Sequence, residues 1–177
     1  MSHAPTNTKQ DSHALKHYIT YTTKVPNIVT VLLLTVIYPT DHSVHRTRPR
    51  AITLINKRLN TNNWRQIPFP SADVIIVQIS GTFGHMTIFN IYDDSRTRVV
   101  MPILTEFLSN NRFSICASPT DHMIWLRDFN SHHFLWEEEQ NVHLCNMPQA
   151  RQTAQVILDL MAQYSMQLAL PKNHLTL

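Results

Sequence analysis

Residues 73–92 read D-V-I-I-V-Q-I-S-G-T-F-G-H-M-T-I-F-N-I-Y, and this stretch decides the fold. Two runs rich in β-branched and aromatic residues, Asp73–Ser80 and His85–Tyr92, flank the only two glycines of the chain, Gly81 and Gly84. Such runs favour strands, and a short glycine-containing connection between them is typical of a hairpin. Because the first run is almost continuously apolar, we expect a sheet that other elements cover on at least one face.

Further elements are expected on both sides of this hairpin. Apolar runs predict strands at Ile28–Tyr38, Ala51–Asn56, Phe113–Cys116 and Met123–Leu126. Apolar residues at helical spacing predict two helices, Val99–Leu108 with Pro102 in its first turn, and Met147–Leu168 with Asn146 as its N-cap. The segments between them are interpreted as a polar loop, Asp41–Pro49, and a linking stretch, Leu59–Pro70, whose Trp64 and Ile67 pack inward.

This order of strands and helices predicts a layered α/β domain. We expect the domain to span residues 28–177, because residues 1–27 are polar and lack a clear period. We interpret that N-terminal segment as disordered or loosely attached.

Composition places few limits on function. The net charge of +3 permits nucleic-acid binding without arguing for it. The basic residues of Arg46–Arg65 are interpreted either as a solvated loop and strand edge or as a phosphate-facing rim. Two cysteines, Cys116 and Cys145, form no disulfide framework, and we expect free thiols. With no signal peptide and no transmembrane segment, we expect an intracellular protein, nuclear or cytoplasmic.

A group of polar side chains follows the predicted strand Met123–Leu126. An acid, an amide and two imidazoles stand within six positions, at Asp128, Asn130, His132 and His133. Such groups are costly to bury without partners, and at a strand end they are the usual material of an active site. The two histidines could bind a metal or phosphate, or could simply bond to their surroundings.

Other residues near this group favour plainer interpretations. We expect Trp125, Phe134 and Trp136 to pack in the core rather than to stack on bases. Glu137–Glu139 favours a solvated acidic turn. A zinc site could be imagined from four residues, but their spacing matches no paired-ligand pattern: His132, His133, His143 and Cys145.

Several motifs together resemble one protein family. Asp128-Phe129-Asn130 at a strand end is similar to the G-D-F-N signature of the endonuclease/exonuclease/phosphatase family, and N-I-Y-D (Asn90–Asp93) resembles the N-x-Y segment at an earlier strand end. The runs R-A-I-T-L-I-N-K (Arg50–Lys57), P-S-A-D-V-I-I-V-Q-I and D-F-N-S-H-H-F-L-W-E look like the endonuclease domain attached to reverse transcriptases of non-LTR, LINE-like retrotransposons. The resemblance runs from about Tyr38 to Leu170.

The resemblance implies a DNase I-like, two-sheet α/β sandwich that cleaves DNA phosphodiesters with Mg²⁺. Carried over by motif, Asp128 is the general acid/base, Asn130 bonds the scissile phosphate, and Tyr92 donates its hydroxyl to a phosphate oxygen or holds Asp128 in place. His133 and Arg127 are candidate phosphate contacts; Arg127 stands where the family has glycine. The metal ligands are not assigned.

Two family features have no counterpart in the sequence. The family's metal-binding glutamate belongs before Tyr38, but the first glutamate is Glu106, and the chain ends K-N-H-L-T-L without the family's S-D-H motif. We therefore expect a partial domain, truncated at both ends, whose endonuclease activity is impaired. The alternative is a non-catalytic retroelement remnant that at most binds nucleic acid.

Overall fold

The computed structural model describes residues 33–45, 48–94, 97–128 and 131–169. The N-terminal segment and the first part of the predicted strand Ile28–Tyr38 lie outside them. The chain divides into two compact units, Met1–Leu34 and Thr35–Leu177.

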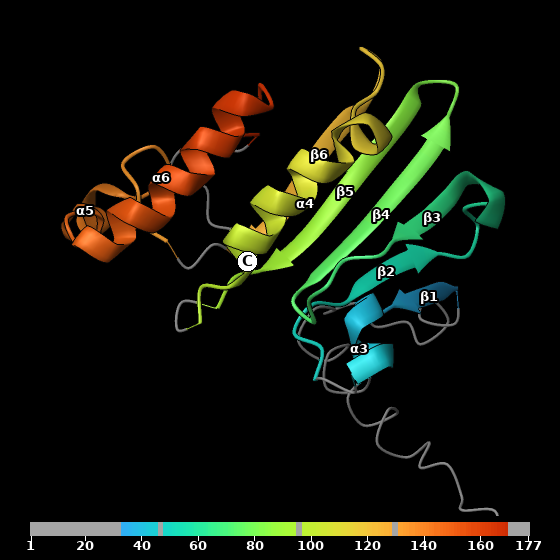
Figure 1. The fold of residues 1–177 in the computed structure, drawn as a ribbon, viewed down its shortest axis with the longest axis horizontal. Coiled ribbons are helices and arrows are strands. Elements are labelled where there is room, and N and C mark those ends of the chain that lie inside the picture. The colour runs from blue at the N-terminus through green and yellow to red at the C-terminus, as the bar shows by residue number, and fades with distance from the viewer. Residues whose placement is uncertain (1–32, 46–47, 95–96, 129–130, 170–177) are drawn as a thin grey trace, which may run out of the picture. The chain divides into compact units, whose positions relative to one another are not determined.

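Two sheets form the framework (Figure 1). The larger has the strand order β3 (Trp64–Ile67), β4 (Val74–Gly81), β5 (Gly84–Tyr92) and β6 (His122–Asp128). Its first two pairings are antiparallel, and β6 runs parallel to β5. The smaller sheet pairs β1 (Leu34–Ile37) with β2 (Thr53–Asn56).

The predicted hairpin is confirmed as β4 and β5. Gly84 has a φ of +97°, and a Cβ at this position would lie 2.8 Å from the carbonyl oxygen of Thr120. Glycine adopts positive φ without the steric cost of a side chain, so Gly84 lets the chain turn while Thr120 packs closely. The turn therefore depends on its glycine for both conformation and space.

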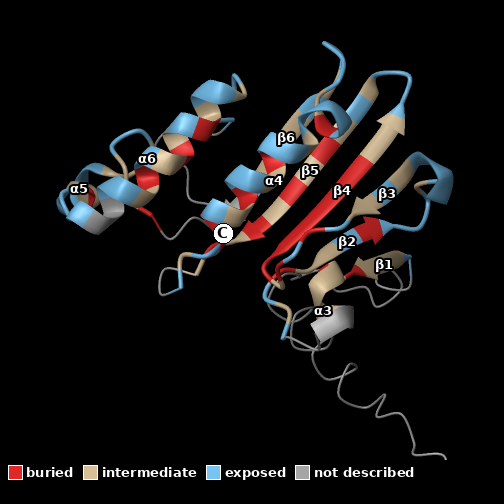
Figure 2. Ribbon diagram, in the orientation of Figure 1, coloured by how far each residue is buried: buried red, intermediate tan, exposed pale blue. Residues whose placement is uncertain are grey.

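Strand β4 is buried along most of its length (Figure 2). Val74 and Ile76 belong to one hydrophobic cluster, whereas Ile75 and Val77 belong to another. Since successive side chains point to opposite faces of a sheet, β4 has a core on each side. The first cluster includes helix residues, and the second includes Ile37 and Ile55 of the small sheet. The predicted two-sheet α/β sandwich is confirmed in this arrangement.

Four α-helices occur in the described residues: α3 (Thr40–His45), α4 (Val100–Ile115), α5 (Val142–Cys145) and α6 (Pro148–Gln163). Short 3₁₀ turns lie at Thr61–Asn63 and Glu139–Asn141. Leu104 and Leu108 of α4 and Ile157 of α6 are fully buried in the first cluster, where they pack with β4 and β5. These helices cover the face of the sheet opposite the small sheet.

Two segments interpreted as irregular contain regular structure. Asp41–Pro49 was expected to be a loop, but α3 occupies its start, with Asp41 in the first turn, where a carboxylate stabilises the helix dipole. The linking stretch Leu59–Pro70 contains β3, which pairs with β4. Trp64 and Ile67 do pack inward, against the second and first clusters respectively.

The helix boundaries also differ from the predictions. The strand predicted at Phe113–Cys116 is wrong, because α4 continues to Ile115 past non-helical dihedrals at Asn111. Asn146 is not the N-cap of α6; Met147 is, without a side-chain bond, while the Asn146 Oδ1 atom accepts from the Arg151 guanidinium at 3.0 Å. The helix ends at Gln163, five residues earlier than predicted, and Ser165 beyond it has a φ of +52°.

The three aromatic residues that were expected in the core, Trp125, Phe134 and Trp136, differ in burial. Trp125 and Trp136 pack against the first cluster, as predicted, and the Trp125 ring lies 6.2 Å from that of Phe89. Phe134 is 44% exposed, so its predicted place in the core is wrong. It lies in a loop, beside the His133 ring at 5.9 Å.

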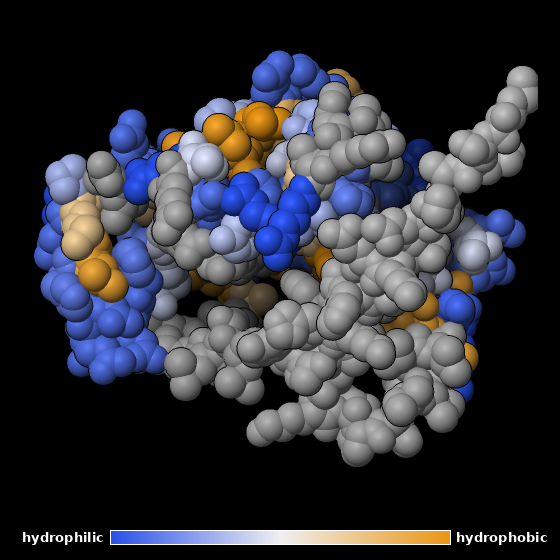
Figure 3. Space-filling view, turned by 90° about the horizontal axis from the view of Figure 1, so that it is seen from below, coloured by the Kyte–Doolittle hydropathy of each residue, from blue (hydrophilic) through white to orange (hydrophobic). Residues whose placement is uncertain are grey.

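Among the coloured residues of the face seen in Figure 3, hydrophilic ones predominate, and hydrophobic ones form separate patches. Cys116 is half-buried and Cys145 is buried, and both are free thiols. In the part of the chain that the structure describes, no helix has the length and apolar character that a membrane span requires.

Candidate functional site

The candidate site lies where β5 and β6 end. Tyr92 is the last residue of β5 and Asp128 the last of β6, and the two are directly paired in the parallel register. Parallel strands bring their carboxyl ends to the same edge of a sheet, which is where α/β folds commonly place their ligands. The backbones of two residues that are 36 positions apart in the sequence thus lie side by side on adjacent strands.

Tyr92 is firmly held but keeps its hydroxyl available. Its backbone N–H donates to the carbonyl of Asp73 at 2.8 Å, which extends the β4–β5 pairing by one step. The Arg50 guanidinium carbon lies 5.2 Å from the centre of the Tyr92 ring, within the range of a cation–π contact. Within the described residues, no hydrogen bond engages the Tyr92 hydroxyl, and the side chain is only half-buried.

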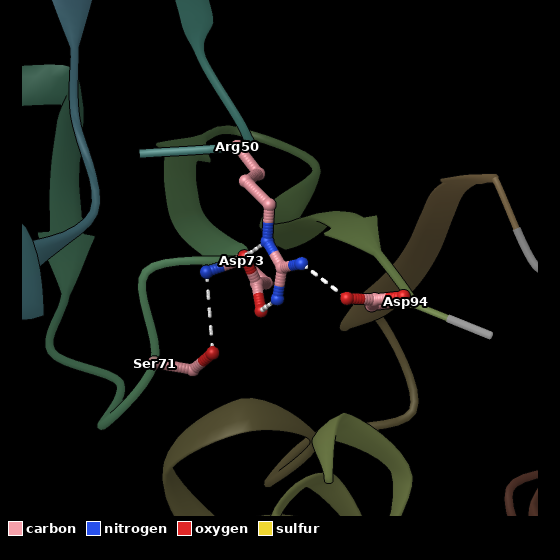
Figure 4. A network of polar contacts seen from close by, with 4 residues as sticks. All are labelled: Arg50, Ser71, Asp73 and Asp94. Carbon is pink, nitrogen blue, oxygen red and sulfur yellow. Dashed lines mark hydrogen bonds and ion pairs between the residues drawn. The ribbon is translucent and has the colours of Figure 1, made fainter. Parts of the chain in front are cut away.

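Arg50 is bound by two aspartates (Figure 4). Its Nε and one Nη donate to the two carboxylate oxygens of Asp73, each at 2.5 Å, and its other Nη donates to Asp94 at 2.5 Å. The Asp73 N–H in turn donates to the Ser71 hydroxyl at 3.1 Å. These bonds connect the segment before β2 to the beginning of β4 and the end of β5.

Hydrogen bonding and burial act in opposite directions on the pKa of Arg50 in this cluster. The Asp73 side chain is 6% exposed, whereas those of Asp94 and Arg50 are 16% and 37% exposed. The Asp73 hydrogen bonds are the largest influence on Arg50 and, with those of Asp94, raise its pKa still further above its usual value, while burial acts in the opposite direction. Arg50 is therefore charged at every accessible pH.

Asn90, two residues before Tyr92, has a structural role. Its side-chain amide donates to the Ile52 carbonyl at 2.9 Å and to the Thr53 hydroxyl at 3.1 Å. These bonds join β5 to the start of β2 and so fix the small sheet against the large one. The N-I-Y segment thus has one member that holds the two sheets together and another at the candidate site.

The remaining predicted site residues are placed only in part. Arg127 and Asp128 have described backbone within β6, and Asn130 lies outside the described residues, so its role stays a prediction. The His133 Nδ1 atom accepts from the Leu135 N–H at 3.3 Å, and its ring lies 5.0 Å from Trp136. No described contact joins His133 to Tyr92.

The neighbouring histidine and glutamates form local bonds. His132 Nδ1 lies 2.8 Å from Glu137 Oε1, and Glu138 accepts from Gln140. The interpretation of His132 as a residue that bonds to its surroundings fits these contacts. Glu137 is less solvated than expected, because its side chain is 14% exposed.

The described side chains do not form a cation site. Within residues 33–45, 48–94, 97–128 and 131–169, no group of three or more His, Cys, Asp or Glu side chains could hold a metal ion. Asp73 and Asp94 are the carboxylates that meet in this cluster, and a guanidinium already binds both. The described donor set therefore does not fit the Mg²⁺ that the sequence resemblance implies.

Sequence reasoning missed the Arg50 cluster. Arg50 was predicted only as one of the basic residues of Arg46–Arg65 and as the first residue of the run R-A-I-T-L-I-N-K, and Asp73 as the first residue of a strand. The partners are 23 and 44 positions from Arg50 in the chain, so no local pattern joins them. The sole local signal was that all three stand at the ends of predicted strands, where polar side chains from different strands can meet.

The fold and site define a mixed α/β domain with two sheets and a polar cluster at the ends of its strands. No protein-family model and no curated protein matches the sequence. Among solved structures, the chain is similar to the endonuclease domain of TRAS1, a telomere-specific non-LTR retrotransposon, with a TM-score of 0.43 and 13% sequence identity. The match covers 72% of this chain and 52% of the other, so the chain spans about half of that domain.

Proposed function

We propose that this chain is a retroelement-derived nuclease domain that hydrolyses DNA phosphodiester bonds with impaired activity. The observation that supports this most is the pairing of Tyr92 with Asp128 at the ends of β5 and β6. The sequence motifs N-I-Y and D-F-N, which lie far apart in the chain, each contribute one of these residues. A shared site requires the two residues to lie at the same edge of the sheet, and neither motif by itself predicts that they do.

The proposed chemistry divides among three residues. In hydrolysis, water attacks phosphorus, loses a proton, and the bond from phosphorus to the leaving oxygen breaks. Asp128 is proposed to accept the proton of water or to protonate the leaving oxygen, a role that contributes roughly 10²–10⁴-fold in enzymes. Tyr92 is proposed to donate its hydroxyl to a non-bridging oxygen, with the Asn130 amide as a second donor. An available hydroxyl on Tyr92 agrees with this role.

The resemblance implies Mg²⁺ as the cofactor, which would neutralise the charge that develops on phosphorus-bound oxygens. Because the described side chains do not form a site for it, no step is assigned to the ion. The roles proposed for Asp128 and Tyr92 are proton transfer and hydrogen bonding, which follow from the chemistry of their own side chains.

Nicking of supercoiled plasmid tests the proposal. The intact chain with Mg²⁺ should convert plasmid to the open-circular form, and Asp128→Ala should abolish this conversion. Asp159→Ala, which removes an exposed carboxylate on α6, is the matched control and should leave the rate unchanged. Equal rates for wild type and Asp128→Ala would mean that the site or the activity is wrongly assigned.

A second candidate function is nucleic-acid binding without cleavage. It is favoured by the Arg50 cluster, in which both aspartates are bound by a guanidinium rather than left for a cation. This candidate predicts DNA binding that weakens with added salt and no nicking above that of Asp128→Ala. Both measurements use the same preparations, so one series separates the two candidates.

A further inference from the structure

The Arg50 guanidinium has unused hydrogen-bonding capacity. A guanidinium carries five N–H donors in a fixed planar arrangement. Three bonds to Asp73 and Asp94 engage three of these donors, and no other described residue accepts from Arg50. Two donors therefore remain on a side chain that is 37% exposed.

The same bonds fix the position of the guanidinium. The two-point contact with Asp73, whose side chain is 6% exposed, determines the plane of the group, and the bond to Asp94 holds it from another direction. An arginine held in this way loses less conformational entropy on binding a ligand than a free surface arginine does. A planar pair of N–H donors matches the oxygens of carboxylates and phosphates.

The location of Arg50 selects between these two anions. Its guanidinium lies over the Tyr92 ring, and Tyr92 is paired with Asp128 across β5 and β6. An anion bound to Arg50 consequently lies beside the strand ends at which the proposed function places a DNA phosphate. A nucleic-acid backbone offers phosphates at regular intervals, so one chain can occupy both positions.

We propose that Arg50 is a DNA-backbone contact that binds a phosphate oxygen through its two remaining N–H donors and thereby positions the strand beside Tyr92. The inference rests on the proposed function, since it assumes that nucleic acid occupies this edge of the sheet. The formal charge of Arg50, Asp73 and Asp94 together is −1 (one positive, two negative). The phosphate is therefore held by directed hydrogen bonds rather than by a long-range field, and Asp94 opposes the contact.

Two substitutions with opposite expected effects test the proposal. Fluorescence anisotropy with a labelled DNA duplex, in EDTA so that cleavage cannot occur, measures the dissociation constant. Arg50→Met should weaken binding about tenfold, the expected effect of losing a charged hydrogen bond. Asp94→Asn should tighten it roughly twofold, because it removes a negative charge beside the phosphate while the amide oxygen can still accept from the guanidinium.

Matched controls separate a specific contact from a change in net charge. Arg112→Met removes an exposed arginine of α4, outside the basic segment Arg46–Arg65, and Asp159→Asn removes an exposed carboxylate of α6. Neither should change the dissociation constant by more than about twofold. Arg50→Met should also lower the magnitude of the salt dependence by about one ion, whereas both controls should preserve it.

The outcomes are distinct. If Arg50 only clamps the fold, both Arg50→Met and Asp94→Asn reduce stability in urea, and Asp94→Asn does not tighten binding; that result overturns the proposal. Equal binding by Arg50→Met and Arg112→Met overturns it too, while leaving the proposed function intact. If wild type does not bind DNA at all, the proposed function and this inference both fail. Should Arg50→Met not fold, Asp94→Asn and Arg50→Lys, which keeps the charge but loses the planar donors, decide by the same measurement.

Discussion

The ion pair between Arg50 and Asp73 should contribute measurably to stability. We consider a double-mutant cycle of Arg50→Met, Asp73→Asn and the combined variant. The two contacts between these side chains are both 2.5 Å long, and the side chains are 37% and 6% exposed. The coupling free energy between them measures the pair itself, because the cycle cancels the effect of each residue on its other neighbours.

The burial of the pair sets the expected magnitude. Exposed ion pairs contribute about 0–1 kcal/mol, whereas removing one partner of a fully buried pair costs about 3–5 kcal/mol. Asp73 is nearly inaccessible, but solvent screens the guanidinium of Arg50, so the coupling should be about 2 kcal/mol. For a chain of this length, a change of that size in the unfolding free energy shifts the melting temperature by roughly 4–8 °C.

Urea unfolding followed by circular dichroism, with linear extrapolation for the four proteins at neutral pH, gives the coupling. Arg58→Met, which removes an exposed arginine whose side chain makes no hydrogen bond to a described residue, is the control for loss of a surface arginine and should change the unfolding free energy by less than about 0.5 kcal/mol. A coupling below about 0.5 kcal/mol would refute the reasoning, because it would place the pair among exposed ion pairs.

Three further predictions concern the framework of the site. Phe89→Ala removes a fully buried ring that packs with Trp125 and should lower the unfolding free energy by about 3–5 kcal/mol, seen as a lower urea midpoint. Gly84→Ala forces a side chain into positive φ and against the backbone of Thr120, and should cost about 1–3 kcal/mol by the same measurement. Hydrogen bonds from three backbone N–H groups, that of Ser118 foremost, lower the pKa of Asp121. The ionised carboxylate therefore stabilises the fold above the pKa that Asp121 has in the unfolded chain. This contribution is lost as pH falls through the lower pKa of the folded state. Asp121→Asn should thus lower stability at neutral pH and flatten the decline of the urea midpoint as pH falls below about 4.

The strands could be predicted where burial on both faces makes the sequence continuously apolar. β4 is of this kind, whereas β5, in which buried and half-buried residues alternate, was recognised by its β-branched and aromatic residues and by the glycine turn before it. β3 was missed because its four residues, W-R-Q-I, include two polar side chains and show no strand pattern. Its pairing with β4 arises from contacts that are distant in sequence, since Arg65 aligns with Gln78.

The end of α4 was mistaken for a strand for a related reason. Phe113 and Ile115 alternate with a polar residue, a pattern with period two, but Phe113 is 87% exposed and only Ile115 is buried. Tertiary packing of Ile115 extends the helix where local preference favoured a strand. The candidate site could likewise be predicted only in part. Sequence motifs identified Tyr92 and Asp128, whereas the cluster of Arg50, Asp73 and Asp94 could be recognised only in the three-dimensional structure.

The central claim is that the ends of β5 and β6 form a phosphodiester site in which the Tyr92 hydroxyl takes part. Plasmid nicking by Tyr92→Phe tests it most directly, because this substitution removes one oxygen atom and keeps the ring under Arg50. Tyr164→Phe is the matched control, because it removes a buried hydroxyl from a tyrosine that packs against the first hydrophobic cluster. We predict that Tyr92→Phe slows nicking by at least about tenfold, while Tyr164→Phe nicks at the wild-type rate. Equal rates for Tyr92→Phe and wild type would contradict the account.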